Sequence, residues 1–254
     1  MKRFVSMICV CVMMVTVHAQ TKLTITTDKT TSLIFPFAIK HVDRGTASVL
    51  AQQVKEAPEI LLVKAAVKDF AETNLSVVTY DGSVYAFTIT YDNKPSVLVI
   101  YLPVNKTATI SSYANMILDN DITVKGIKDK KYDMKVGVIG IYIKDNIIYC
   151  QLYINNESAV DYDVDLLRFF IKDKKRSKRT AVQEVEQEPV FTAGNHSAIK
   201  GNGNTVFVVA LEKFTIPDKK YLAVRITEKN GGRHFLLKVH NKDILKATPL
   251  PDLN

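Results

Sequence analysis

The sequence has no tryptophan and only three cysteines, at positions 9, 11 and 150. Without tryptophan, the chain has no indole on which a base or a sugar could stack. Two of the cysteines lie in the apolar start of the chain, so the remainder has a single thiol, which excludes an internal disulfide framework. Cys150 stands in the apolar stretch IIYCQLYI. This setting predicts a buried thiol that behaves as a small hydrophobic residue.

Long apolar runs are also lacking, except at the start of the chain. There Lys2 and Arg3 precede the apolar run Phe4–Val17, and Ala19 follows shortly after. A basic start, an apolar centre and a small residue at the end are typical of a secretory signal peptide. The apolar run is shorter than the roughly 20 residues that span a bilayer. We therefore expect residues 1–19 to be a signal peptide, cleaved between Ala19 and Gln20, and the protein to be exported.

Positive charge is in mild excess, and one segment concentrates it. Loss of Lys2 and Arg3 with the signal peptide lowers the formal net charge from +8 to +6, which does not demand a nucleic-acid partner. Export excludes nuclear import as the role of the run KDKKRSKR, but DNA binding by counterion release remains open. Three alternating glutamates in QEVEQEPV would partly neutralise the run if the chain folds back as a hairpin. A solvated loop and a partner-binding edge are equally compatible with the six cations, which are Lys172, Lys174, Lys175, Arg176, Lys178 and Arg179.

Short β-branched and aromatic segments between turn residues predict a mainly β fold with two β-sandwich-like domains. The clearest signal is NLSVVTYDGSVYAFTITY, in which Asp81-Gly82 predicts a type I′ turn between strands Leu75–Tyr80 and Ser83–Tyr91. Alternation along the second strand predicts that Phe87 and Ile89, with Tyr85 and Tyr91, face the core.

The predicted domain order is a signal peptide (1–19), an N-terminal β domain (20–104), a linker with a short helix (105–134), a C-terminal β-sandwich (135–248) and a tail (249–254). The boundary is expected near Asp129, within a charged stretch. Ser111 or Ser112 is the expected cap of the linker helix. The stretch TASVLAQQV fits either a short helix or a strand.

No constellation of catalytic residues is visible. The four histidines outside the signal peptide form no HExxH motif, and GxSxG and P-loop motifs are absent. The alternating acids of DYDVD lack the glycine and glutamate of a calcium-binding EF-hand loop. We therefore expect no catalytic, cofactor-binding or metal-binding residues, and no enzyme activity.

Four segments together resemble the TraN proteins of Bacteroidetes conjugative transposons. They are the leader, the opening KLTITTDKTTSLIFPFAIKHVDRG, the NLSVVTYDGSVYAFTITY hairpin and the block NESAVDYDVDLLRFFIKDKKRSKRTAVQEVEQEP. The resemblance extends over essentially the whole chain after the leader. Its most specific part is the block from Asn156 to Pro189.

Residues 22–103 are more distantly similar to the first domain of the TrbG/CagX family, an outer-membrane-side component of type IV secretion systems. The matching features are Thr30-Thr31, Gly45 and Thr73-Asn74-Leu75 before the aromatic hairpin. The second half departs from that family, because its acidic-glycine motif is missing and the Arg168–Pro189 block stands in its place.

These resemblances imply a non-enzymatic structural subunit of a conjugative transfer channel, in the periplasm or at the periplasmic face of the outer membrane. The implied partners are scaffold and outer-membrane subunits of a large hetero-oligomer, and direct contact with DNA stays open. The alternative is an exported β-sandwich that binds DNA or a surface glycan.

Overall fold

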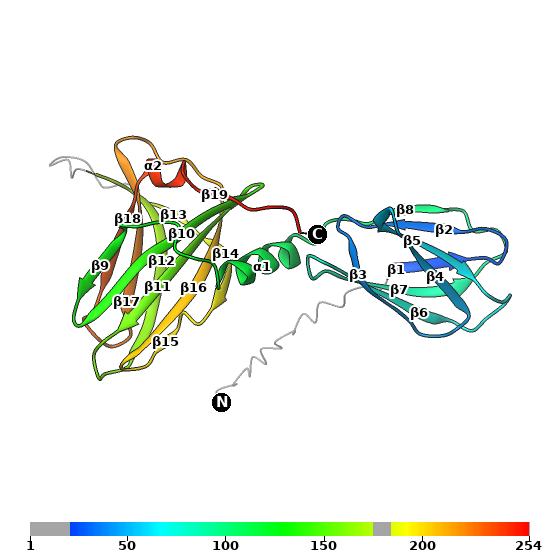
Figure 1. Ribbon diagram of the computed structural model, residues 1–254, viewed down its shortest axis with the longest axis horizontal. Coiled ribbons are helices and arrows are strands. Elements are labelled where there is room, and N and C mark those ends of the chain that lie inside the picture. Colours follow the sequence, from blue (N-terminus) through cyan, green and yellow to red (C-terminus); the bar gives the residue numbers. More distant parts are fainter. Residues whose placement is uncertain (1–20, 175–183, 254) are drawn as a thin grey trace, which may run out of the picture. The chain divides into compact units, whose positions relative to one another are not determined.

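The computed structural model describes residues 21–174 and 184–253. In these residues the chain is mainly β, with two groups of sheets (Figure 1) and a short helix that lies between the groups along the sequence, which confirms the predicted fold class. The expected cleavage site at Ala19 and Gln20 lies outside the described residues. The chain divides into two compact units. The first contains the residues up to Ile34, Ile39–Val78 and Val84–Tyr101, and the second contains Phe35–Ala38, Thr79–Ser83 and Leu102–Asn254.

The first unit is built from two four-stranded sheets. Its strands are β1 (Thr21–Ile25), β2 (Thr31–Ile34), β3 (Ile39–Arg44), β4 (Val49–Val54), β5 (Ala57–Ala65), β6 (Thr73–Thr79), β7 (Val84–Tyr91) and β8 (Val99–Tyr101). The sheet orders are β1-β7-β6-β3 and β4-β5-β2-β8. The ambiguous stretch TASVLAQQV forms β4, because its backbone groups pair with β5. Phe87 and Ile89 are buried as expected, while Tyr85 and Tyr91 are half-buried.

The hairpin between β6 and β7 exists, but its turn differs from the expected type I′ turn. The ladder ends at Val78 and Val84, and Gly82 has a φ of +80° while Asp81 is not in the left-handed region. A type I′ turn needs a positive φ at both central residues. Asp81 instead has its side chain buried, where it accepts hydrogen bonds from Thr79 Oγ1 (2.5 Å) and Ser83 Oγ (2.5 Å). These bonds hold the aspartate in a longer loop.

The second unit is a sandwich of two larger sheets. One sheet has the order β14-β16-β11-β10-β19, with β9 also paired to β10, and the other has the order β13-β12-β17-β18, with β15 paired to β12. The strands are β9 (Lys128–Lys131), β10 (Met134–Lys144), β11 (Ile147–Asn156), β12 (Tyr162–Asp173), β13 (Val185–Gln187), β14 (Pro189–Gly194), β15 (Ala198–Ile199), β16 (Gly203–Glu212), β17 (Lys220–Glu228), β18 (Phe235–Val239) and β19 (Thr248–Pro249).

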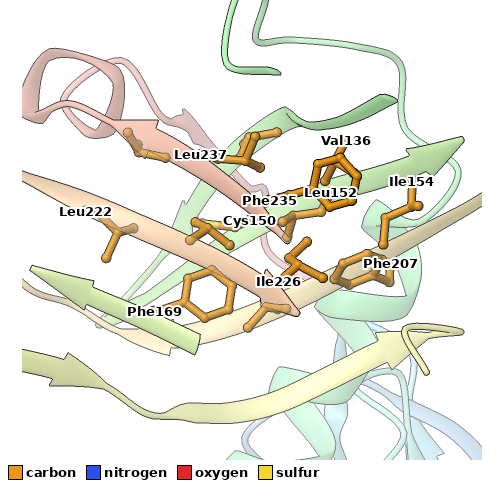
Figure 2. Packing of buried hydrophobic residues seen from close by; sticks show 14 of the residues in the cluster. Val136, Cys150, Leu152, Ile154, Phe169, Phe207, Leu222, Ile226, Phe235 and Leu237 are labelled. Carbon is orange, nitrogen blue, oxygen red and sulfur yellow. The ribbon is translucent and has the colours of Figure 1, made fainter. Parts of the chain in front are cut away.

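The core of the second unit lies between these two sheets. Cys150 and Phe207 from the first sheet pack with Phe169, Leu222 and Leu237 from the second (Figure 2). Side chains alternate along each strand, so the neighbours of these residues in sequence point to the outer faces. Cys150 is fully buried, as its apolar setting predicted. Burial raises the pKa of its thiol to about 12.

Helix α1 (Lys106–Ile117) belongs to the second unit. Tyr113, Ala114 and Ile117 are buried and pack with Tyr149 from the sheet. The long continuous part of this unit therefore begins at Leu102, and the charged stretch near Asp129 forms β9 inside it. The expected cap at Ser111 or Ser112 is wrong, because the side chain of Asn105 accepts from the Ala108 amide (3.2 Å) and starts the helix earlier. A second, four-residue helix, α2 (Asn241–Ile244), follows β18.

Candidate partner-binding face

The basic run begins at the end of β12. Lys172 and Asp173 are the last two residues of β12, and Lys174 follows them. Lys172 Nζ lies 2.9 Å from Glu184 Oε1, and Lys174 Nζ donates to the carbonyl of Asp218 (2.6 Å). The other predicted partner-binding cations, Lys175, Arg176, Lys178 and Arg179, lie outside the described residues.

The acidic segment after the run folds back onto β12. In the resulting β12–β13 pair, Ile171 lies opposite Val185 and Phe169 opposite Gln187. Arg168 donates from Nε (2.7 Å) and Nη2 (2.6 Å) to the two carboxylate oxygens of Glu186. These bonds lower the pKa of Glu186 below its usual range. The acidic segment therefore folds back as expected, and one cation of the basic run, Lys172, pairs with it in the described residues.

The outer face of β12, β17 and β18 carries two aromatic rings under a layer of cations. Phe170 and Tyr221 point away from the core, yet Phe170 is fully buried and Tyr221 is 7% exposed. The guanidinium of Arg225 lies 4.8 Å from the centre of the Phe170 ring, and Lys238 Nζ lies 5.7 Å from that of Tyr221. Lysine and arginine stems can cover apolar surface while their charged ends stay in water. We call the set Arg168, Lys172, Arg225 and Lys238 the cationic face.

Two members of the cationic face remain available to an anionic partner. Arg168 and Lys172 are engaged by Glu186 and Glu184. Within the described part of the chain, no carboxylate forms an ion pair with Arg225 or Lys238. Arg225 lies opposite Arg168 across the β12–β17 ladder, so two guanidinium groups stand next to each other on this face.

A second charged cluster joins the loop after β17 to the chain before β12. Arg233 donates from Nε to Glu228 Oε1 (2.8 Å) and from Nη2 to the carbonyl of Asp161 (2.6 Å), and its own carbonyl accepts from the hydroxyl of Tyr162 (2.9 Å). The side chains of Arg233 and Glu228 are only 16% and 13% exposed. Hydrogen bonds from Arg233 lower the pKa of Glu228. This pair holds the loop after β17 against the chain before β12.

The acids of DYDVD do not converge. Asp161 accepts from Lys200 Nζ (2.7 Å) and from the amide of Gly201 (2.9 Å), and these bonds lower its pKa. Asp163 and Asp165 are exposed. Among the described residues, no group of three or more histidine, cysteine, aspartate or glutamate side chains is placed to hold a metal ion.

Sequence reasoning missed Arg225, Lys238 and Arg233. The signal for the first two is the alternation in YLAVRITE and FLLKV, which places Arg225 and Lys238 on the face opposite the core residues Val224 and Leu237. Arg233 had no comparable signal, because it lies in a loop.

A family model described as domain of unknown function DUF4138 matches residues 107–249, more than half of the chain. The chain belongs to this family. The DUF4138 region contains α1 and the second sandwich, including the cationic face. Residues 23–95 are similar to a second family, domain of unknown function DUF8473, which corresponds to most of the first unit. A search of curated proteins found no match. No helix in the described part of the chain is both long and apolar enough to cross a membrane.

Proposed function

We propose that this DUF4138 protein is an exported, non-enzymatic structural subunit of a conjugative transfer channel, at the periplasmic face of the outer membrane. One observation carries the proposal. The block from Asn156 to Pro189, the most specific part of the resemblance to TraN proteins, includes β12 and β13 and supplies half of the cationic face. A surface of this kind binds an acidic partner by charge complementarity, which mainly sets orientation and encounter rate.

Open sheet edges provide the second means of assembly. Strand β8 is at the edge of its sheet in the described residues, and Val99 and Tyr101 on it are 49% and 76% exposed. An extended segment of a partner subunit can add to such an edge through main-chain hydrogen bonds. Edge pairing then gives affinity, while the cationic face gives orientation.

The direct test deletes the gene for this protein in cells that carry the whole transfer element, and measures the transfer frequency. We expect transfer to be lost and to be restored by the wild-type protein, with co-purification of other channel subunits. Unchanged transfer after deletion would show that the proposal is wrong.

The cationic face is tested separately with Arg225→Glu, because Arg225 has no ion-pair partner in the described residues. Reversal of Lys174, Lys175, Arg176, Lys178 and Arg179 to glutamate tests the rest of the basic run. We expect both variants to lower co-purification and transfer, while Lys213→Glu, an exposed lysine elsewhere in the unit, leaves them unchanged. Thermal unfolding checks that each variant is folded. If Arg225→Glu and the run reversal both behave like the control, the docking role is refuted.

The alternative, a module that binds DNA directly, is favoured by the same free cations. A gel shift that is tight and steeply salt-dependent would support it, and Arg225→Glu should then weaken that shift.

A further inference from the structure

A polar pocket lies where the two sheets of the second unit meet at β9 and β18, which run side by side at one edge of the sandwich (Figure 1). Its volume is about 660 Å³, within the range of small-molecule sites. Its walls are the segment that leads into β9, the outward side of β18, and α2. We call this space the seam pocket.

Positive charge dominates the seam pocket. Four lysines line it, together with two aspartates; the lysines are Lys125, Lys128, Lys238 and Lys242. All four are exposed, and none forms an ion pair with a carboxylate in the described residues.

Both aspartates of the pocket are already engaged. Asp129 lies 3.1 Å from Lys131 Nζ and accepts from the Leu236 amide (3.3 Å). Asp243 accepts from the His240 amide (2.9 Å). Asp129 is thus paired with a cation of its own, while Asp243 keeps its negative charge. The four lysines outnumber the two aspartates, so the net charge of the pocket lining is positive.

The backbone of β18 contributes donors at the same place. Among the strands that the structure describes, only β17 pairs with β18, and alternate amides of an antiparallel strand point to opposite sides. The amides of Leu236 and His240 point away from β17 and reach the two aspartates. The amide of Lys238, midway between them, points the same way, toward the pocket. The ring Nδ1 of His240, in the pocket wall, is buried and has no hydrogen-bond partner in the described residues.

We propose that the seam pocket binds the terminal phosphate or diphosphate group of a small ligand or of a lipid headgroup. Phosphate groups prefer sites where lysine ammonium groups and backbone amides converge. The concave shape favours a compact, multiply charged end group. Duplex DNA would instead need an extended row of cations along its backbone. This inference does not rest on the proposed role in conjugation.

The test measures binding of inorganic pyrophosphate by isothermal titration calorimetry at low salt, with protein produced from the full-length sequence. We expect saturable binding that weakens as salt is raised, because exposed charges are screened. The double variant Lys125→Glu/Lys242→Glu should bind at least about tenfold more weakly, since two attractive charges become repulsive. Both lysines are exposed, so the variant should fold, and thermal unfolding checks this.

The matched control is Lys213→Glu/Lys229→Glu, which changes the net charge by the same amount at exposed lysines outside the pocket. We expect it to bind pyrophosphate within about twofold of the wild type. Equal loss in both double variants would mean that only net charge matters, and would overturn the proposal. The absence of saturable binding to any phosphate probe would overturn it as well.

Two further arms identify the source of the phosphate. Vesicles of phosphatidic acid in phosphatidylcholine, compared with phosphatidylcholine alone, test a lipid headgroup. Vesicle binding that the pocket variant loses and pyrophosphate competes away supports a headgroup, whereas pyrophosphate binding alone supports a free ligand. Binding only to duplex DNA with hydroxyl ends would overturn the proposal in favour of a nucleic-acid surface.

Discussion

Removal of the Arg233 side chain should destabilise the second unit far more than removal of a surface arginine. In Arg233→Ala, Glu228 loses its charged partner, and its side chain is only 13% exposed in the wild-type protein. The carbonyl of Asp161 loses a donor at 2.6 Å, and the guanidinium that lies 5.1 Å from the centre of the Tyr162 ring is lost as well.

The size of the effect follows from this burial. Breaking a buried ion pair by removing one partner costs about 3–5 kcal/mol, because the other charge is left without compensation. The pair is not completely buried, so we expect about 3 kcal/mol. The control is Arg168→Ala, whose ion pair with Glu186 has side chains 37% and 43% exposed. Exposed ion pairs contribute little to stability, because water and salt screen them.

Urea unfolding at neutral pH, followed by circular dichroism, measures both variants. The same experiment at low pH adds an independent check. The pKa of Glu228 is lowered in the folded state, so the stability from its charge is complete above the unfolded pKa of about 4.3 and is lost as the pH falls through the folded pKa. The difference between wild type and Arg233→Ala should therefore shrink in acid. If Arg233→Ala costs no more than Arg168→Ala at neutral pH, the argument from burial is wrong.

Three other predictions concern packing and local structure. The Cys150 thiol, with a pKa of about 12, should react with Ellman's reagent only after unfolding, and fast reaction in native buffer would contradict its burial. Asn105→Ala should cost about 1 kcal/mol by loss of the α1 cap; Ser111→Ala should cost clearly less, and the reverse order in denaturant unfolding would disprove the capping role. Gly137→Ala should cost about 1–3 kcal/mol, because its Cβ would lie 2.8 Å from the carbonyl of Ile127. Gly232→Ala is the control, because the new Cβ would have no atom within 4 Å. It should leave the melting temperature nearly unchanged.

Most of the fold could be predicted from the alternation of apolar and polar residues along the strands. Alternation and turn residues identified the β6–β7 hairpin and the inward positions of Phe87 and Ile89. Prediction from neighbouring residues failed where contacts with distant parts of the chain decide the local structure. The stretch of β4 is strand because β5 lies beside it. Helix α1 starts at Lys106, because the side chain of Asn105 caps it. The Asp81-Gly82 pair was read as a type I′ turn, but hydrogen bonds to the Asp81 carboxylate select another geometry.

The cationic face was also predictable only in part, because two of its four residues are brought there by tertiary structure. The basic run and the glutamates after it are visible as charges, and their pairing across β12 and β13 follows from one hairpin. Arg225 and Lys238 come from strands far along the chain, and only the sheet order brings them onto the same face as Lys172. The seam pocket depends on two strand edges that sequence pattern alone does not place together.

The short segment from β13 to β14 ties the two sheets of the second unit at one border. Only Glu188 separates β13, which pairs with β12 in one sheet, from β14, which pairs with β16 in the other. Neither border strand can detach far without pulling on its neighbour in the opposite layer. Native-state hydrogen exchange should therefore report similar protection for the β12 and β16 amides that face these strands, as parts of one cooperative opening unit. Any force that a partner applied to this border would be shared between the two layers.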